Sequence, residues 1–444
     1  MRIVRASVLD VPEDPFRGGA LRAEQDAGIL VDGEGVIGDR GPFAAVKRRN
    51  PNAGVCELDG GLLLPGFVDA HVHFPQARII GGLGLPLLDW LERCALPEEA
   101  RMADLGYARR IATEFVSGLA DAGTTTALVF GAHFAGAVDA LFEAASERGL
   151  RIASGLVVSD RRLRPELHTT AQRAYDEGLA LARRWHGEGR CRYAVTPRFA
   201  LSCSAELLSS CAALHEAVPG SWITSHVNEN PAEIAAVREL FGSSYVESYR
   251  RHGLIGPRTV LAHDVHPTDP ELECLAGGGA AVAHCPTSNA SLGSGLFPLH
   301  RHLAHHVPVA LGTDVGGGTG YSMFKEGLQA YFIQRLRGPD GVPLTATHLL
   351  HLATGAGAAA LGLAAEIGDL GVGKRFDALW LRPPPDSPLD VGLRHAEDAE
   401  QALARAFALG VSSDVAGVWV DGEAVKPAGA RPELVTAMRN SDIV

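Results

Sequence analysis

Two histidines of this sequence, His71 and His73, stand two positions apart at the end of an apolar run at residues 62–70. Because the side chains of a strand alternate between its two faces, both imidazoles would lie on the same face. Two neighbouring imidazoles at the end of a buried strand can supply half of the ligands of zinc or a similar divalent metal. This spacing is common by chance, so a metal site requires further ligands elsewhere in the chain.

Ligand-type residues also stand at the ends of three later apolar segments, as His226, His263 and Asp314. The C-terminal ends of the strands of a barrel meet on one face, where these side chains would come together with the first pair. Three of these histidines together with the carboxylate would suit a mononuclear site for zinc or another borderline divalent metal. Glu229 follows His226 by three positions, so it could exchange protons in the same site without being a ligand.

Short apolar segments alternate with amphipathic segments through the middle of the chain. Eight strands separated by helices predict the α/β class and a (β/α)8 barrel of the TIM type. Periodicity alone also allows an open doubly wound sheet, but polar residues at the ends of many different strands favour the barrel. The predicted strands are residues 62–72, 125–130, 151–158, 192–196, 222–227, 259–263, 280–284 and 307–313. The predicted helices include residues 109–122, 135–148, 170–185, 205–217 and 231–241.

The two ends of the chain share a different pattern. Asp-Gly turns at residues 32–33 and 421–422, each between short apolar segments, predict β-hairpins, and residues 368–381 are also expected to form strands. We therefore expect one small β-sandwich built from both termini. The predicted division is 1–62 for the first part of the sandwich, 63–365 for the metal-dependent barrel and 366–444 for the rest of the sandwich.

The composition argues against several classes of partner. The formal net charge of −12 disfavours nucleic acid and anionic membranes, because both bind basic surfaces. No apolar stretch approaches the roughly 18 residues that span a bilayer, and the N-terminus lacks the apolar core of a signal peptide. The seven cysteines are scattered and lack a Cys-x-x-Cys pair, which predicts reduced, mostly buried thiols in a cytoplasmic protein. A small neutral substrate is compatible with all of these features.

The order of the motifs resembles the amidohydrolase superfamily. The pattern is PGFVDAHVH at residues 65–73, then two separate histidines, then GTD at residues 312–314. Within that superfamily the chain resembles the guanine deaminases, and this resemblance runs from about residue 60 to 365 and more weakly to both ends. It rests on the segments HFPQ (73–76), TPRF (196–199), ENP (229–231), CPTSN (285–289), GSGLF (293–297) and GTDVGGGT (312–319). The resemblance implies the same barrel and two-part sandwich.

The resemblance also implies a ligand set and a metal. One Zn²⁺ per subunit is expected, with iron or another divalent metal as alternatives. Many amidohydrolases hold two metals bridged by a carboxylated lysine, but this sequence has no lysine between Lys47 and Lys325. A single metal is therefore expected, although a second metal bridged by a carboxylate stays open. The implied ligands are His71, His73, His226 and Asp314.

The activity implied by the resemblance is the hydrolytic deamination of guanine to xanthine and ammonia. Zinc-bound hydroxide would attack purine C2, Glu229 would be the proton shuttle and His263 would lie beside the metal-bound water. Asp314 would also orient the nucleophile. The family further implies a homodimer. The purine contacts would be Gln76 through its amide, Arg198 through a bidentate contact to the O6/N7 edge, and Phe199 by stacking.

Other interpretations remain open or are disfavoured by particular residues. A related enzyme could act on another aminated heterocycle of the 8-oxoguanine, triazine or pterin type, as a deaminase or a chlorohydrolase. A binding protein that keeps the fold without activity is a second alternative. The Pro-Cys-x-x-Cys motif of the unrelated zinc deaminase fold is absent. Residues 355–360 match a dinucleotide fingerprint in spacing, but they continue a helical stretch and indicate helix packing. Asp264 departs from the family pattern and could tune His263 or point away from it.

Overall fold

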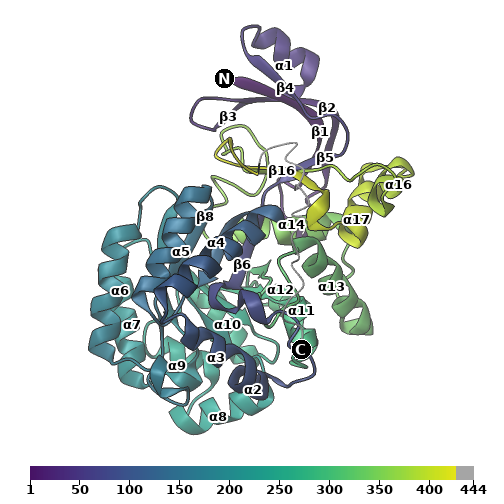
Figure 1. The fold of residues 1–444 in the computed structure, drawn as a ribbon. Helices are drawn as coiled ribbons and strands as arrows, with labels where there is room; N and C mark the ends of the chain where they lie inside the picture. Colours follow the sequence, from purple (N-terminus) through teal and green to yellow (C-terminus); the bar gives the residue numbers. More distant parts are fainter. Residues whose placement is uncertain (427–444) are drawn as a thin grey trace, which may run out of the picture.

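Eight parallel strands in sequence order form the larger of two sheets in the computed structural model, which describes residues 1–426 (Figure 1). Each strand pairs with the next one along the chain, and the short strand β9 (Val157–Val158) pairs with the fourth. A doubly wound sheet would reverse direction partway, so this order confirms the barrel and rejects the open alternative. The eight strands are β6 (Phe67–His73), β7 (Thr124–Phe130), β8 (Arg151–Gly155), β10 (Cys191–Pro197), β11 (Trp222–Val227), β12 (Thr259–His263), β13 (Ala281–His284) and β14 (Val309–Leu311).

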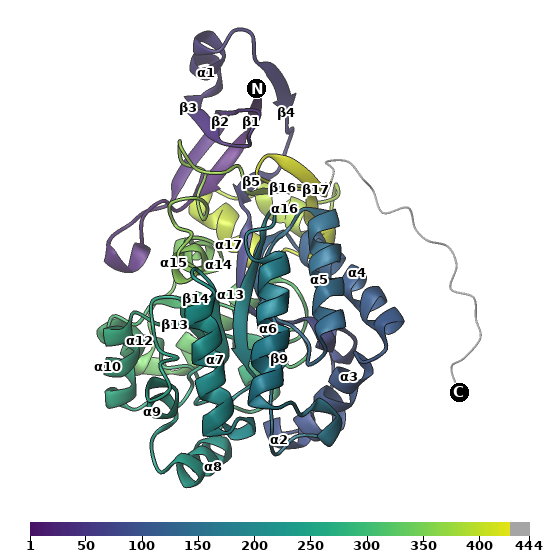
Figure 2. The ribbon, with the colours of Figure 1, turned by 90° about the vertical axis from the view of Figure 1, so that its left-hand side faces the viewer.

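Helices surround these strands and connect one to the next (Figure 2). Side-chain caps define several starts: Asp104 accepts the Tyr107 N–H before α4, and Ser204 accepts the Leu207 N–H before α7. The predicted helices are all present, within a few residues at each end. The helices of the barrel and its loops are α2 (Leu87–Trp90), α3 (Leu96–Arg101), α4 (Leu105–Asp121), α5 (Ala135–Arg148), α6 (Ala171–Trp185), α7 (Ala205–Ala217), α8 (Pro231–Phe241), α9 (Tyr245–Arg250), α10 (Asp269–Gly278), α11 (Pro286–Ser291), α12 (Leu299–Ala304), α13 (Met323–Leu336), α14 (Ala346–Ala353) and α15 (Gly355–Ala360).

The second sheet combines both ends of the chain and lies at one end of the barrel in both views (Figures 1 and 2). Val4 and Ile29 from the N-terminal strands share one buried core with Phe376 and Trp419 from the C-terminal part. Sheet order is β17-β16-β15-β5-β1-β2-β3, with β4 paired to β1. The strands are β1 (Arg2–Asp10), β2 (Arg22–Val31), β3 (Ile37–Pro42), β4 (Gly54–Glu57), β5 (Leu62–Pro65), β15 (Ala378–Leu381), β16 (Val415–Val420) and β17 (Glu423–Lys426), with helices α1 (Phe43–Arg49), α16 (Pro388–Arg394) and α17 (Ala399–Leu409) beside them.

Both predicted hairpins are confirmed. β2 and β3 pair in antiparallel fashion, and the Asp32 carboxylate accepts the N–H groups of Glu34 and Val36 across the turn. β16 and β17 pair likewise around the Asp-Gly turn at residues 421–422. The strand predicted over 368–381 is wrong except for β15. Gly368 and Gly373 have positive φ values of 100° and 90°, so this stretch turns where a strand would have to be extended. The domain boundaries stay predictions, and the part of 366–444 beyond residue 426 lies outside the described residues.

The strand predicted over 62–72 is two strands that belong to different sheets. Gly66 donates its N–H to Asp377 O on the sandwich side, at 2.9 Å, and Phe67 donates to Gly123 O on the barrel side, at 3.0 Å. Leu64 pairs with β15, whereas the residues after Gly66 pair with β7. The chain therefore passes from one sheet into the other at a single glycine, with no loop between them.

Two further expectations concern helices. Residues 355–360 form α15, and a side chain on Gly357 would meet Val68 Cβ at 2.7 Å, so these glycines serve close helix packing, as expected. Within residues 1–426, no helix is both long and apolar enough to cross a membrane. All seven cysteines are unpaired, and four of them are buried.

Gly66→Ala is predicted to lower the free energy of unfolding by about 1–3 kcal/mol, the usual range for overpacking. An added Cβ would lie 2.3 Å from both Oγ1 and Cγ2 of the buried Thr125, while the backbone itself permits alanine. Urea denaturation of the purified variant measures the change. Gly54→Ala is the matched control, because nothing lies within 4 Å of its added Cβ. Equal stability of the two variants would contradict this account.

Candidate metal centre and active site

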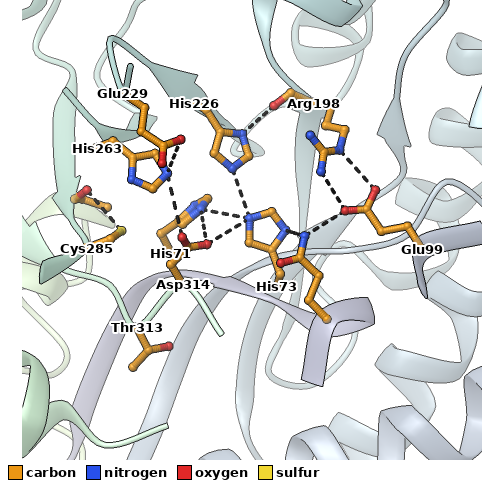
Figure 3. Close-up of polar contacts among 12 residues, drawn as sticks. His71, His73, Glu99, Arg198, His226, Glu229, His263, Cys285, Thr313 and Asp314 are labelled. Atoms are coloured by element: carbon orange, nitrogen blue, oxygen red, sulfur yellow. Dashed lines mark hydrogen bonds and ion pairs between the residues drawn. The ribbon is translucent and has the colours of Figure 1, made fainter. Parts of the chain in front are cut away.

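Four buried side chains converge at the C-terminal ends of the barrel strands (Figure 3). His73 Nε2 lies 3.2 Å from His71 Nε2 and 3.1 Å from His226 Nε2. Asp314 Oδ1 lies 3.4 Å from His71 Nε2 and 3.2 Å from His73 Nε2. The structure thus brings together the four residues that the sequence suggests as ligands, from β6, β11 and the turn after β14.

The separations between these atoms fit a single metal ion. Four ligand atoms at about 2.0–2.1 Å from one zinc, at tetrahedral corners, lie about 3.3–3.4 Å apart. His226 Nδ1 lies 2.6 Å from the Arg198 carbonyl oxygen, to which it donates, so its Nε2 keeps the lone pair that a metal needs. Three imidazole nitrogens facing one another at this distance repel unless a cation lies among them. The donor set therefore suits a divalent metal.

The ionisation of these groups is the one that metal ligation requires. Burial lowers the pKa of His71 to about 4 and that of His226 well below its ordinary value, so both rings are neutral at pH 7. Burial opposes ionisation of Asp314, but hydrogen bonds and positive charge from His71 and His73 outweigh it and hold its pKa well below the usual range. Neutral imidazoles beside an ionised carboxylate bind a metal without first losing protons.

A buried carboxylate, Asp69, joins the two strands that carry the first and last of the four side chains. It accepts the His71 N–H at 3.2 Å, the Thr313 N–H at 3.0 Å and the Thr313 hydroxyl. The Asp314 N–H donates to His71 O at 2.9 Å, directly across the gap between β14 and β6. These bonds close the barrel at the metal site, because β14 and β6 share no regular ladder.

The backbone turns sharply at the ends of three of the strands. Asn228, His263, Asp264 and Asp314 all have positive φ values, of 49°, 78°, 44° and 47°. This left-handed region is uncommon for residues other than glycine, and such strain persists where the surrounding structure holds it. Here it ends each strand abruptly, so the side chains of His263 and Asp314 turn toward the centre of the barrel mouth (Figure 3).

Glu229 and His263 form a pair on one side of the four ligand atoms. Glu229 Oε2 lies 3.4 Å from His263 Nε2, and its Oε1 accepts the Ser294 hydroxyl at 3.0 Å. His263 Nδ1 lies 2.9 Å from Asn289 Oδ1, which fixes the ring orientation. Burial raises the pKa of Glu229. Burial lowers the pKa of His263, but the charges of Glu229 and Asp314 outweigh it and raise that pKa. The pair can hold a proton between its two members.

Gln76 and Arg198 lie on the other side of the ligand atoms, and both contact one carboxylate that the sequence analysis missed, Glu99. Arg198 donates through Nε and Nη2 to Glu99 at 3.1 and 2.8 Å, and Gln76 Nε2 donates to the same carboxylate at 2.8 Å. Arg198 and Glu99 are each only 3% exposed. Burial raises the pKa of Glu99, but the Arg198 charge and hydrogen bonds outweigh it and lower it to about 2. The only sequence signal was a pair of adjacent carboxylates, Glu98 and Glu99, in a segment that also carries Glu92, Arg93 and Arg101.

Phe199 and Asp264 take different places. Phe199 lines the same pocket as Arg198, with its ring centroid 6.5 Å from that of His226. Asp264 points away from the ligand atoms: it accepts Asn228 Nδ2 at 2.8 Å and pairs with His302 Nε2 at 2.9 Å. Of the two possibilities considered for Asp264, the structure therefore favours the one in which it points away from His263.

Side chains fill most of the pocket over the four ligand atoms. Its free volume is about 20 Å³, enough for about one water molecule. Glu229 and Glu233 from the start of α8, and Leu87, Trp90 and Leu91 from α2 and the turn after it, complete its wall. Burial, and to a smaller extent the charge of Glu229, raise the pKa of Glu233 to about 7. A ligand larger than water must displace side chains to enter.

His226→Ala is predicted to weaken zinc binding by more than about 100-fold, since even the loss of an outer hydrogen bond costs 10–100-fold. Metal content after zinc loading and dialysis, measured by mass spectrometry, reports the change. His252→Ala is the control, because within residues 1–426 the His252 side chain bonds only to Ser209 of α7, away from the ligand atoms. One zinc per chain retained by the His226 variant would contradict the ligand assignment.

Comparison with known proteins agrees with the fold and with the site. The family model described as "Amidohydrolase family" matches residues 62–425. A probable guanine deaminase from Deinococcus radiodurans is 57% identical over 432 residues, which cover 96% of this chain and 98% of the relative. The guanine deaminase of Escherichia coli is 37% identical over 434 residues, covering 96% and 98%.

Solved structures give the same result in three dimensions. The structure of Escherichia coli guanine deaminase superposes with a TM-score of 0.91 at 36% identity, covering 96% of this chain and 99% of the other. A guanine deaminase from C. acetobutylicum with guanine bound in its active site superposes with a TM-score of 0.88 at 25% identity, covering 95% and 99%. The order of the strands, the converging histidines and aspartate, and these matches together place the chain in the amidohydrolase family.

Proposed function

We propose that this protein hydrolyses guanine to xanthine and ammonia, with one zinc ion per chain. The observation that carries the proposal is the arrangement within one pocket: a proton-transfer pair, Glu229 and His263, lies on one side of the ligand cluster, and the Arg198 guanidinium lies on the other. The relatives named guanine deaminase, up to 57% identical over nearly the whole chain, support the same substrate. The O6/N7 edge of guanine and its N3/2-amino edge lie on different sides of the purine, like the major-groove and minor-groove edges of a base pair.

Zinc is the metal that the donor set favours. Three imidazole nitrogens and one carboxylate oxygen are ordinary zinc ligands, and no lysine belongs to the cluster. When bound, such an ion lowers the pKa of a coordinated water to about 7 and so supplies a nucleophile at neutral pH. His71, His73, His226 and Asp314 would hold it.

Glu229 is the proposed proton carrier. Its Oε2 faces His263 Nε2 at 3.4 Å, and Ser294 holds the other oxygen, so the carboxylate is fixed in place. It would take one proton from the attacking water and deliver it to N3 of guanine, then take the remaining proton of the hydroxyl group added at C2 and deliver it to the amino group, which leaves as ammonia while C2 becomes a carbonyl. His263 would stabilise the negative charge that develops on the attacking oxygen, and Asp314 would orient that oxygen. The products are xanthine and ammonia.

Arg198 is the proposed recognition group for the carbonyl edge of guanine. Glu99 occupies its Nε and Nη2 edge, so Nη1 and the second Nη2 proton remain as a two-donor edge for O6 and N7. Gln76 donates its amide hydrogen to Glu99, so its oxygen remains as an acceptor for a purine N–H. Phe199 would contact the flat face of the ring. Because the free space in the pocket is about the size of one water molecule, a purine would enter only with displacement of lining side chains such as Leu87, Trp90 and Leu91.

The cellular context and the assembly are proposals of the same kind. Seven free thiols are typical of a reducing compartment, which supports a cytoplasmic location. A homodimer is proposed from the family alone. The remaining alternative, that another aminated heterocycle is the substrate, predicts a different set of substrates that are turned over. Xanthine and ammonia formation from guanine, beside adenine, 8-oxoguanine and triazines, decides between them: turnover of another heterocycle with none of guanine would reject the proposal.

Glu229→Gln is predicted to keep the metal but lower kcat for guanine by about 10²–10⁴-fold, the usual contribution of general acid–base catalysis. Glutamine preserves the shape of the side chain and can still accept from Ser294, but it cannot carry the proton. Metal analysis and initial rates on the same preparation measure both effects. Glu239→Gln, on the exposed side of α8, should leave both unchanged. Substantial turnover by the Glu229 variant would exclude its role as proton carrier.

Glu99→Gln is predicted to lower kcat/KM for guanine by about 10–100-fold, because Arg198 loses the bidentate partner that orients it. The effect on 2-aminopurine, which lacks O6, should be much smaller. Glu98→Gln is the matched control: the neighbouring carboxylate is also buried but bonds to Tyr107 and Arg101, so any loss there should affect both substrates equally. A Glu99 variant that loses activity equally on both purines would show that Glu99 is only structural.

A further inference from the structure

A cavity separate from the metal centre lies at the opposite end of the barrel. Its volume is about 520 Å³, within the usual range of about 300–1,000 Å³ for small-molecule sites. The first residues of β8, β10 and β11 line it, and two turns of the sandwich, at Glu34 and Asp421, lie over it. In both overall views the sandwich sits at this end of the barrel (Figures 1 and 2). None of the proposed catalytic residues belongs to its wall.

Ion pairs hold the arginines on the side of the cavity next to the sandwich. Arg151 Nη2 contacts Asp421 Oδ1 at 2.8 Å, and Arg190 Nε contacts the other oxygen of Asp421 at 2.5 Å. Arg190 also contacts Glu423 at 2.7 Å, and Arg151 contacts the buried Asp377. These pairs connect the barrel to the sandwich and compensate one another, while the Glu34 and Glu366 carboxylates of the same lining have no cationic partner within 4.0 Å among residues 1–426.

The opposite wall carries two guanidinium groups of a different kind, those of Arg192 and Arg258. Among residues 1–426, no carboxylate lies within 4.0 Å of either group, whereas Arg151 and Arg190 both have such partners. Uncharged groups hold both in place. Arg192 Nη1 donates to the carbonyl oxygens of Gly189 and Cys191 at 2.9 and 2.8 Å, and the Arg258 guanidinium lies 5.3 Å from the ring centroid of Trp222. The two positive charges are therefore positioned but not neutralised.

The surroundings of these two arginines match one class of ligand. They come from the strand ends on either side of β11, and guanidinium groups bind phosphate oxygens in a two-donor geometry. His186, between them, has its pKa lowered by burial and further by the charges of Arg192 and Arg258, and it accepts the Tyr193 N–H, so it adds no third charge. Ile152 and Ala153 supply an apolar floor, and the carboxylates of Glu34 and Glu366 supply acceptors for hydroxyl groups.

We propose that this cavity binds a hydroxylated phosphate monoester, of the size of a sugar phosphate or a nucleoside monophosphate. Its phosphate lies between Arg192 and Arg258, and its hydroxyl groups face the carboxylates on the sandwich side. A ligand held there contacts both the barrel and the sandwich, so its binding stabilises the folded chain. This site is independent of the deaminase assignment.

Isothermal titration calorimetry of the zinc-loaded protein tests the site with ribose 5-phosphate, guanosine 5′-monophosphate, inorganic phosphate and guanosine. The wild-type protein is expected to bind the two esters more tightly than phosphate, with a rise in Tm, and guanosine is expected not to reproduce that rise. The Arg192→Gln/Arg258→Gln variant is expected to bind the esters at least tenfold more weakly. Arg109→Gln/Arg183→Gln, which removes two exposed arginines without carboxylate partners among residues 1–426, is the matched control and should bind as the wild type does.

The outcomes separate the possibilities. Stronger binding of ribose 5-phosphate than of the nucleotide identifies a sugar phosphate as the class of ligand, and the reverse identifies a nucleotide; both support the site. No binding of either ester at millimolar concentration, or equal weakening in both double variants, overturns the proposal. Thermal denaturation and zinc content confirm that each variant is folded, and neither measurement depends on turnover of guanine.

Discussion

The closure of the barrel between β14 and β6 is the constraint on which the rest of the site depends. The two strands share no ladder, and they are linked by the Asp314 N–H, which donates to His71 O, and by Asp69, which accepts from Thr313. These same few residues place His71 and Asp314 on facing sides of the metal site. A shift of the closure by one residue would turn these side chains away from each other, since neighbouring residues face oppositely. The same set of hydrogen bonds therefore closes the barrel and positions the metal ligands.

The parts of this structure that could be predicted from sequence are those encoded in short stretches. Apolar runs with a polar end predicted the barrel strands, and the two-residue spacing of His71 and His73 placed both rings on one face. The division of 62–72 into two strands could not be predicted, because it depends on pairing of Leu64 with β15, more than 300 residues later. Glu99 was missed for a similar reason: its importance comes from contact with Arg198, and nothing in its own segment indicates that partner.

The pairing of Glu99 with Arg198 shows how this enzyme uses buried charge. Removing two charges from water costs several kcal/mol per ion, and an apolar pair of similar volume is often equally stable. Two ionised groups buried to this degree thus add little to stability. Their contribution is the orientation of Arg198, because the bidentate contact fixes the plane of its guanidinium group and leaves one edge of that group for a ligand. The proton-transfer pair on the other side of the pocket is fixed in the same manner by Ser294 and Asn289.

The direct passage from β5 into β6 at Gly66 has a mechanical consequence. No loop separates the two strands, so the sandwich and the first strand of the barrel are directly connected. His71 lies only five residues after the junction at Gly66. A hinge between the two modules would displace a metal ligand, so they must move as one body. Insertion of a new module at Gly66 would separate the strand that carries two metal ligands from the sandwich strand before it, and is therefore expected to disrupt the metal site.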